Sequence, residues 1–449
     1  PADSPEATYV RERREALGGY VPARSERAPA LAAPPQEFFE EFFASSDGRE
    51  VSTTMAFVRV LNTLMRSESH GQLCVPVIPD EARTFGMESF FRGFGIYDPN
   101  GQLYEPVDQK SLTYYKESRD GQVLQEGISE AGGMSSFIAA ATAYATHGVN
   151  TIPFYIFYSM FGFQRIADLI WSACDSRGRG FLLGATAGRT TLNGEGLQHQ
   201  DGHGLLMASP FPTLRAYEPA FGFEIAILIR DGLERMYERQ EPWIYYITLH
   251  NENYAMPALE VDDRERVTKG VVDGMYLLRK SSASGPRVQL MGSGSILQQA
   301  LQAAAILEER YGVAADVWSV TSYKQLRSDA TQAERWNRLH PDQPPRGCPL
   351  WSLLSGLEGP FVSASDNVSL VADQISPWIP GRFWVLGTDG FGRSDTRENL
   401  RRHFEIDAAA VVVAALGSLA ERGQLEPAQV TKAMADLDVD PDQPDSLFA

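Results

Sequence analysis

The feature that most constrains the fold is a regular alternation of short apolar runs with longer segments of helical periodicity. In the first half of the chain, the apolar runs typical of buried strands cover residues 73–78, 123–128, 152–158, 180–185, 216–219 and 243–249. Segments such as 135–145 and 162–173 lie between them and have the composition and spacing of helices. Strands that alternate with helices indicate a parallel sheet covered by helices, so we expect an α/β fold.

The alternation stops and then resumes, which predicts two domains. Residues 258–286 are rich in charged residues, Ser and Gly and suggest a boundary. Strand-like runs then recur at 288–295, 315–320, 361–364 and 382–386, and a strongly apolar helix is expected at 408–422. The predicted organisation is a linker or arm with an entry helix at 1–49, an α/β domain at 50–258, a linker at 259–285 and a second α/β domain at 286–449. Each domain should hold a mainly parallel sheet.

Composition narrows the possible partners and compartments. The net charge of −18 disfavours binding to nucleic acid and to anionic membranes, and it would suit a basic protein partner. Cys74, Cys174 and Cys348 are widely spaced, which suggests buried thiols in a reducing, cytoplasmic compartment. We expect no membrane span, because no run of about 18 apolar residues is present. The start at Pro1 suggests a processed or truncated chain.

A carboxylate stands where the second predicted strand gives way to a helix, in the segment Leu124-Gln-Glu-Gly-Ile-Ser-Glu130. An acidic residue in a first helical turn can simply compensate the helix dipole. Alternatively, Glu130 is a buried acid at the carboxyl end of a strand, where open α/β sheets bind ligands. The pattern alone leaves both interpretations open.

The segment from Phe154 to Arg165 is dense in aromatic residues. These rings could be core residues. However, Tyr158-Ser-Met-Phe161-Gly follows a strand and reads as a loop, where an aromatic side chain could stack on a flat ligand ring. Core packing and ring binding both remain possible from the pattern.

A glycine-rich loop follows at 190–203 and carries Glu195, His199, Asp201 and His203. So many ionisable residues on a loop suggest function rather than scaffolding. His-x-Asp-x-His could bind a metal, but this spacing favours metal binding mainly on a helix, and a glycine lies within it. We therefore favour acid–base or substrate-binding histidines and no metal. Asp80 and Glu81, after another strand, are either a polar cofactor contact or a solvated pair.

These motifs, in this order, resemble the homodimeric type of pyruvate dehydrogenase, the first component of the pyruvate dehydrogenase complex. The similar stretches include Pro79-Asp-Glu-Ala-Arg-Thr-Phe-Gly-Met, Tyr158-Ser-Met-Phe-Gly-Phe-Gln-Arg, Arg189-Thr-Thr-Leu-Asn-Gly-Glu-Gly-Leu-Gln-His and Gly387-Thr-Asp-Gly-Phe-Gly-Arg-Ser-Asp. The resemblance covers about residues 37–449. It implies a transketolase-like architecture in which 50–258 is the thiamine pyrimidine-binding domain and 286–449 is the transketolase C-terminal-like domain.

The resemblance also implies a reaction, cofactors and partners. The cofactor would be thiamine diphosphate, with Mg²⁺ held by a diphosphate-binding domain whose Gly-Asp-Gly…Asn motif this sequence lacks. Pyruvate would be decarboxylated, and the acetyl group would pass to a lipoyl domain of the dihydrolipoyl acetyltransferase second component. A homodimer is expected. The alternatives are another transketolase-like 2-oxo-acid decarboxylase, or a binding-only fragment that lacks the diphosphate-binding domain.

Residue roles follow from the resemblance as expectations. Glu130 would hydrogen-bond the pyrimidine ring and promote catalysis. Phe161 would stack on that ring, and His199 and Tyr158 would bind substrate and assist catalysis. The remaining residues expected to bind the cofactor are Asp80, Glu81 and Arg165.

Overall fold

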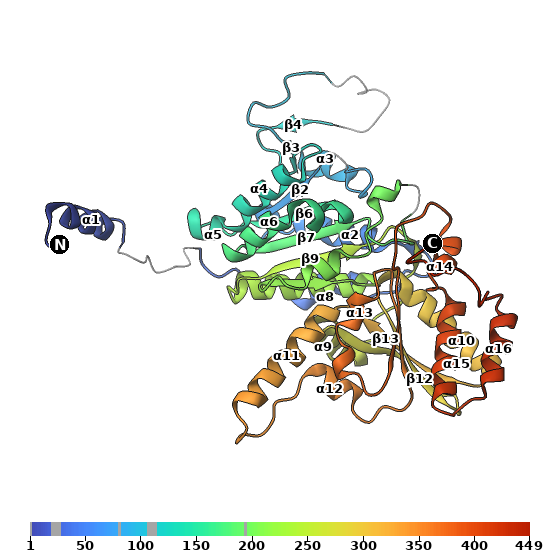
Figure 1. Ribbon diagram of the computed structural model, residues 1–449. Helices are drawn as coiled ribbons and strands as arrows, with labels where there is room; N and C mark the ends of the chain where they lie inside the picture. The colour runs from blue at the N-terminus through green and yellow to red at the C-terminus, as the bar shows by residue number, and fades with distance from the viewer. Residues whose placement is uncertain (1, 19–27, 80–81, 106–114, 193–194) are drawn as a thin grey trace.

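The computed structural model describes residues 2–18, 28–79, 82–105, 115–192 and 195–449. The chain forms two α/β domains, each built around its own sheet, and Figure 1 shows them stacked one above the other. The sheets are separate, as the interrupted alternation in the sequence predicts. The fold is of the α/β class, with mainly parallel sheets flanked by helices, as the sequence predicts.

The first sheet has six parallel strands in the order β5-β2-β6-β7-β9-β8. Their bounds are β2 Cys74–Ile78, β5 Leu124–Gln125, β6 Ile152–Tyr158, β7 Gly180–Ala185, β8 Leu214–Tyr217 and β9 Ile244–Leu249. Most of these strands are apolar along their whole length because helices cover both faces of the sheet. Tyr158 pairs with Ala185, and Ala185 pairs with Leu249, so β6, β7 and β9 end level at one edge.

Helices pack on both faces of this sheet. Phe154 and Ile156 of β6 point to the core shared with α2 (Thr53–Met65) and α8 (Gly222–Leu233). The alternate residues Tyr155 and Phe157 point to the core shared with α4 and α6. The helix α4 spans Glu130–Ala141 and α6 spans Phe163–Asp175.

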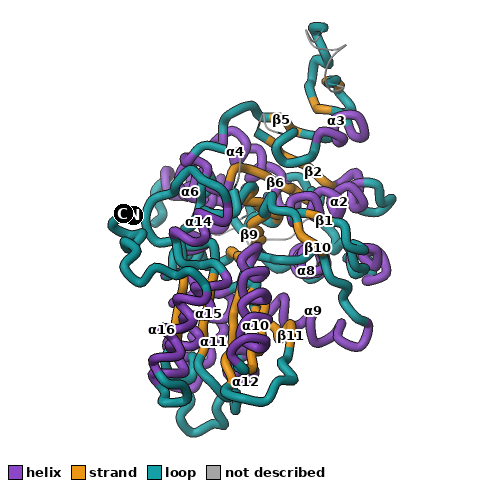
Figure 2. The backbone as a smooth tube through the Cα atoms, turned by 90° about the vertical axis from the view of Figure 1, so that its right-hand side faces the viewer, coloured by secondary structure: helices purple, strands orange, loops and turns teal. Residues whose placement is uncertain are grey.

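The second sheet has the order β11-β13-β12-β14-β15, and all its pairs are parallel except β11 with β13. The bounds are β11 Met275–Arg279, β12 Arg287–Gly292, β13 Ala314–Val320, β14 Phe361–Ala364 and β15 Phe383–Leu386. α10 (Leu297–Tyr311) and α15 (Ala408–Glu421) pack together on one face, as Figure 2 shows. The opposite core is shared with α11 (Tyr323–Leu339) and α12 (Pro349–Leu354).

The segment 259–285, expected to be a linker, is structured. It contains α9 (Arg264–Asp273) and the edge strand β11, so the second sheet begins earlier than the sequence suggested. The chain also continues past the last predicted helix into α16 (Pro427–Asp436). The other helices are α1 Pro5–Ala16, α3 Glu88–Phe94, α5 Ala143–Thr146, α7 Gly204–Ala208, α13 Leu370–Asp373 and α14 Arg397–His403. The short strands are β1 Glu50–Val51, β3 Ile96–Tyr97, β4 Glu117–Ser118 and β10 Tyr254–Ala255.

One segment of the described chain, Arg397–Glu421, is long and apolar enough to cross a membrane. It comprises α14 and α15, and 61% of its most apolar 18-residue stretch is buried inside the protein. A core helix has the same length and composition, so this segment is weak evidence for a membrane span.

Candidate active site

Glu130 lies at the carboxyl edge of the first sheet, in the first turn of α4. The helix begins here because Ser129 is its N-cap, whose hydroxyl oxygen accepts a hydrogen bond from the Gly132 N–H at 3.1 Å. The Glu130 side chain is 11% exposed, and both of its carboxylate oxygens lie 3.1 Å from Nη1 of Arg165. A strand end and a helix start therefore hold this carboxylate at the edge where α/β sheets bind ligands.

Phe161 and Tyr158 come from the turn that follows β6. The strand ends at Tyr158, and a 3₁₀ turn, Ser159–Phe161, leads into α6. The two rings meet edge to face, with 5.9 Å between their centroids. Phe161 therefore lies outside the strand proper, in the loop position that its sequence context suggested.

Arg165 links Phe161 to Glu130. Its guanidinium carbon lies 3.8 Å from the centroid of the Phe161 ring, while its Nη1 reaches the Glu130 carboxylate. A guanidinium is flat, donates hydrogen bonds and stacks on aromatic rings. It makes here the two kinds of contact, ring stacking and hydrogen bonding to a carboxylate, that a flat heterocycle could also make.

His199 approaches this position from the loop that follows β7. It ends a 3₁₀ turn, Leu197–His199, and its ring centroid lies 4.5 Å from that of Tyr158 and 5.1 Å from that of Phe161. Its Nδ1 is 3.7 Å from a carboxylate oxygen of Glu195. Loops from three strand ends thus bring Glu130, the aromatic pair and His199 together.

Asp201 has a different role from the one its loop suggested. It is buried, and its carboxylate accepts hydrogen bonds from Ser159 Oγ at 2.5 Å and from the backbone N–H groups of His203 and Gly204 at 3.0 and 2.8 Å. Asp201 therefore ties the loop to the end of β6. Within the described residues, no group of three or more His, Cys, Asp or Glu side chains is arranged to hold a metal ion.

Two of the expected cofactor contacts, Asp80 and Glu81, lie outside the described residues. The preceding strand β2 lies between β5 and β6 in the sheet. Their expected role stays a prediction.

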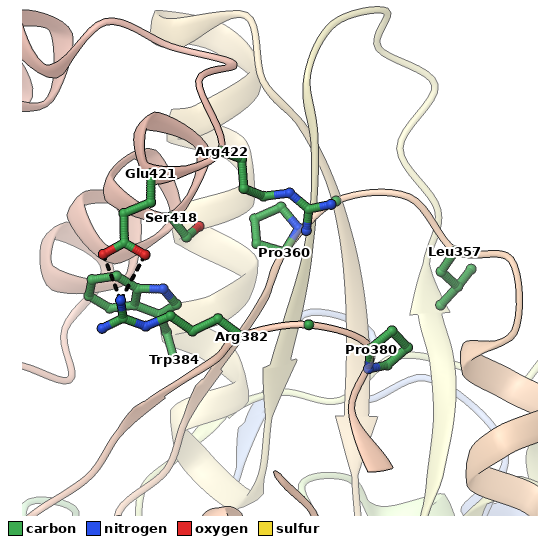
Figure 3. A pocket seen from close by; sticks show the side chains of 10 residues that line it. Leu357, Pro360, Pro380, Arg382, Trp384, Ser418, Glu421 and Arg422 are labelled. Carbon is green, nitrogen blue, oxygen red and sulfur yellow. Dashed lines mark hydrogen bonds and ion pairs between the residues drawn. The ribbon is translucent and has the colours of Figure 1, made fainter. Parts of the chain in front are cut away.

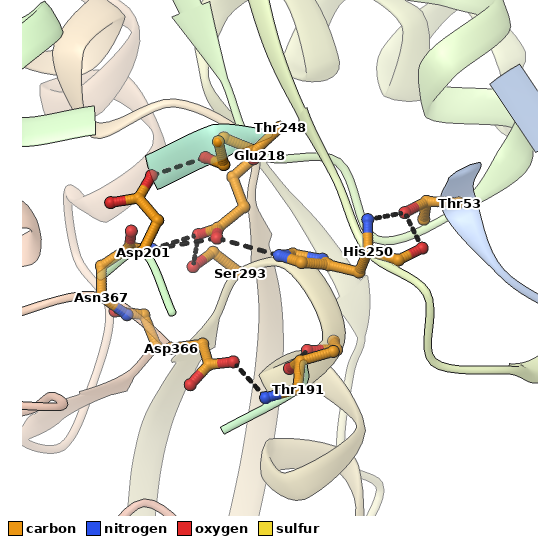
Figure 4. Close-up of polar contacts among 12 residues, drawn as sticks. Thr53, Thr191, Asp201, Glu218, Thr248, His250, Ser293, Asp366 and Asn367 are labelled. Atoms are coloured by element: carbon orange, nitrogen blue, oxygen red, sulfur yellow. Dashed lines mark hydrogen bonds and ion pairs between the residues drawn. The ribbon is translucent and has the colours of Figure 1, made fainter. Parts of the chain in front are cut away.

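A second polar cluster lies between the two domains, and no local sequence pattern predicts it (Figure 4). Glu218 follows β8 and is 4% exposed. Its carboxylate accepts hydrogen bonds from Ser293 Oγ at 2.5 Å and from Nδ2 of Asn367 at 2.9 Å to both oxygens, and Nε2 of His250 lies 3.5 Å away. We call these four side chains the interdomain network. Ser293 and Asn367 belong to the second domain, so the network joins the domains.

Electrostatics in this network favour the ionised form of Glu218. Burial by itself raises the pKa of Glu218, but His250 and the two hydrogen-bonded side chains outweigh burial and hold that pKa below its ordinary value. The 3.5 Å separation is long for a hydrogen bond, so we treat the His250 contact as chiefly electrostatic.

A cavity of about 450 Å³ lies in the second domain, away from these groups (Figure 3). Pro360, Pro380, Trp384 and Arg422 are among the residues that line it. Its polar rim includes an ion pair between Arg382 and Glu421. None of the residues that form the candidate active site lines it, so we do not assign the reaction there.

Two family models match the chain. The pyruvate dehydrogenase E1 component middle domain matches residues 35–257, and the transketolase-like C-terminal domain matches residues 274–407.

Similar proteins extend these matches over nearly the whole chain. It is 51% identical over 446 residues to the pyruvate dehydrogenase E1 component of Pseudomonas aeruginosa, which covers 99% of this chain and 50% of the relative. It is 49% identical over 446 residues to the protein of that name in Escherichia coli K12, with the same coverage. The chain therefore spans about half the length of the curated relatives it matches.

Solved structures share the fold. Transketolase from Leishmania mexicana aligns with a TM-score of 0.61 and 14% identity, over 94% of this chain and 51% of that one. A structure described as "Split gene transketolase, inactive beta4 tetramer" aligns with a TM-score of 0.54 and 17% identity, over 82% of this chain and 98% of that one.

Proposed function

Because the chain belongs to the pyruvate dehydrogenase E1 family, whose middle and carboxy-terminal domains it carries, we propose that it forms the pyrimidine-binding part of a thiamine-diphosphate site for the decarboxylation of pyruvate. The observation that carries this proposal is the flat guanidinium of Arg165, which contacts both the Glu130 carboxylate and the Phe161 ring. The guanidinium of Arg165 stands there in place of a flat heterocycle, so the residues present fit a pyrimidine ring.

The side chains around that position suit specific tasks. When bound, thiamine diphosphate supplies the electron sink that decarboxylation of a 2-oxo acid requires. Glu130 is placed to hydrogen-bond a ring nitrogen of the pyrimidine and to hold or move a proton there. Phe161 offers one face of its ring for stacking. Arg165 would have to leave both groups before the pyrimidine binds.

In this proposal His199 and Tyr158 contact the substrate. Their rings lie 4.5 Å apart, next to Phe161, so a substrate held near the cofactor ring would meet them. An imidazole changes charge near neutral pH and suits binding of a carboxylate or movement of a proton. Glu195, 3.7 Å from His199 Nδ1, would orient this ring.

We further propose that turnover needs a diphosphate-binding segment outside this chain. The chain spans about half the length of its relatives. In contrast, the structure named as a split-gene transketolase is itself covered over 98% of its own length. That segment would supply the Mg²⁺ ligands. A homodimer, acetyl transfer to a lipoyl domain of the dihydrolipoyl acetyltransferase second component and a cytoplasmic location complete the proposal. Without such a segment, the chain would be a binding-only subunit.

The experiment combines this chain with the amino-terminal segment of a full-length relative. Thiamine diphosphate with Mg²⁺ is titrated by calorimetry into each polypeptide alone and into the mixture. In parallel, pyruvate consumption is measured with an oxidised lipoyl domain present as the acceptor of the acetyl group and the electrons. We expect cofactor binding and turnover in the mixture and no turnover with this chain alone.

The outcomes separate the alternatives. Cofactor binding without pyruvate turnover, but with turnover of a longer 2-oxo acid, would favour another decarboxylase of this fold. Cofactor binding with turnover of none of these acids would favour the binding-only subunit. A mixture that binds no cofactor contradicts the proposal.

A further inference from the structure

The second domain holds the amino-terminal end of the loop that carries His199. Asp366, which follows β14 and is 1% exposed, accepts three hydrogen bonds of 2.8 Å from this end. The donors are the backbone N–H and hydroxyl of Thr190 and the backbone N–H of Thr191. Bonds to a carboxylate are stronger than those between neutral groups, so these contacts restrain the chain where the loop leaves the sheet.

A further contact acts at the same end. Arg397 of α14 donates from Nε to the Thr191 carbonyl oxygen at 2.7 Å. Gly188 has a φ of +98°, and a Cβ there would lie 2.4 Å from an Asp366 oxygen. The chain can therefore approach Asp366 this closely because residue 188 has no side chain.

The other end of the loop meets the same domain. Gly202 accepts at its carbonyl oxygen from the Val368 N–H at 2.6 Å. Gln200, which is buried, donates from Nε2 to the Arg393 carbonyl oxygen at 2.8 Å. The second domain thus contacts the segments before and after His199, although His199 itself belongs to the first domain.

We propose that Asp366 is a positioning residue: it sets the place of the His199 loop relative to the cofactor ring, and it makes the second domain a part of the substrate site. This deepens the proposed function and rests on it only for the role of His199. Asp366 belongs to the second domain and acts through Thr190 and Thr191 rather than through substrate.

The first test is backbone amide hydrogen exchange of residues 195–203 in the 449-residue chain. Asp366→Asn places an amide NH₂ where one carboxylate oxygen faces a donor, so at least one of the three bonds is lost. We expect exchange in 195–203 to rise roughly tenfold or more. The control is Asp316→Asn, because Asp316 is also buried in this domain but accepts from Ser281, Arg287 and Gln289 and makes no hydrogen bond with the part of the loop that the structure describes.

A second pair of variants keeps the test decisive if Asp366→Asn does not fold. Arg397→Gln removes the contact to Thr191. The control is Arg402→Gln in the same helix, because Arg402 donates hydrogen bonds to the carbonyl oxygens of Leu437 and Asp438 and, within the described residues, none to the loop. Faster exchange in 195–203 only for the first variant supports the proposal. Unchanged exchange there in every folded Asp366 and Arg397 variant, or an equal rise across the whole second domain in the Asp366 and Asp316 variants, overturns it.

The enzyme assembled with its diphosphate-binding segment gives an independent readout. We expect Asp366→Asn to lower kcat/KM for pyruvate by about tenfold to a hundredfold while the dissociation constant of thiamine diphosphate stays unchanged. Equal losses in cofactor affinity and in kcat/KM would indicate general destabilisation and contradict positioning. If the wild-type assembly fails to consume pyruvate, the proposed function fails, while the exchange measurements still decide the role of Asp366.

Discussion

Two glutamates at the same edge of one sheet differ in how their charges are satisfied. Glu218 is buried between the domains and accepts hydrogen bonds from Ser293 and Asn367, with His250 beside it. Among the described residues, the side chain paired with the Glu130 carboxylate is Arg165, which is 50% exposed. Glu218 is held by partners from two domains, whereas Glu130 is paired with one half-exposed side chain.

This difference distinguishes a carboxylate with a structural role from one that is able to bind a ligand. A buried carboxylate that has all its partners stabilises one arrangement of the chain and has no capacity left for a ligand. A carboxylate shielded from water but paired with a displaceable cation can exchange that cation for a ligand. By this criterion we propose that Glu130 binds a ligand and that Glu218 is structural, although Glu218 is the more deeply buried.

The largest expected effect tests the first half of this comparison. In the assembled enzyme, Glu130→Gln should lower kcat for pyruvate about 10²–10⁴-fold, because an amide keeps a hydrogen bond but cannot move the proton. The melting temperature should change little. The matched control is Glu126→Gln, which alters a carboxylate in the same strand-to-helix turn that accepts a bond from Ser136. Unchanged turnover with a lower melting temperature would make Glu130 a helix-start residue only.

The two glutamates also show what a sequence can reveal. Glu130 is visible because a strand, a glycine and a helix start are neighbours in the chain, and the family resemblance then gave it a role. Glu218 has its partner Asn367 149 residues away, and Asp366 lies 176 residues from Thr190. No local pattern marks such pairs, because tertiary folding alone brings them together.

The same distinction holds for the fold. The central strands were predictable because strands buried on both faces are apolar throughout. The edge strand β11, Met275–Arg279, was missed because it is half-buried and follows a charged segment. For Asp201 the local pattern suggested a functional role, because it is an acidic residue on a glycine-rich loop. In the structure its hydrogen bonds hold this loop to the end of β6.

The second prediction concerns the stability of the interdomain network. Glu218→Gln should destabilise the chain by ~3 kcal/mol, because it places an NH₂ among donors and removes the charge beside His250. Urea denaturation followed by tryptophan fluorescence measures the loss. The control is Glu421→Gln, whose exposed ion pair with Arg382 should contribute less than ~1 kcal/mol. Equal losses in the two variants would contradict the structural role of Glu218.

A smaller effect should appear in the pH dependence of that loss. The pKa of Glu218 is lowered in the folded chain from the ordinary value of 4.5, so its stabilising contribution is complete above that value. The contribution is lost as the pH falls through the lowered folded-state pKa. The stability difference between wild type and Glu218→Gln should therefore be constant near neutrality and shrink in acid. A difference that grows as the pH falls from 6 would show that Glu218 is not held ionised.

The smallest expected effect tests the claim that Arg165 occupies the cofactor position. Arg165 pairs with Glu130 and lies 3.8 Å from the centroid of the Phe161 ring, so a pyrimidine that uses both groups must displace it. A half-exposed ion pair contributes up to ~1 kcal/mol and an exposed cation–π contact ~0.5–1 kcal/mol. Arg165→Ala should therefore tighten thiamine diphosphate binding by roughly threefold to thirtyfold in the assembled enzyme, since 1.4 kcal/mol corresponds to a factor of ten.

The chain contains a closely matched control for that prediction. Arg382 also pairs with a glutamate, Glu421, and lies over an aromatic ring, Trp384, at 4.5 Å from its centroid, but in the second domain (Figure 3). Arg382→Ala removes the same two kinds of contact and should leave cofactor affinity unchanged. Calorimetric titration of both variants measures the difference. Weaker binding in Arg165→Ala alone would mean that the guanidinium stays in place and contacts the bound cofactor, as the family resemblance first suggested. In that case Glu130 would be held by a permanent partner, and the contrast with Glu218 would rest on exposure rather than on exchange.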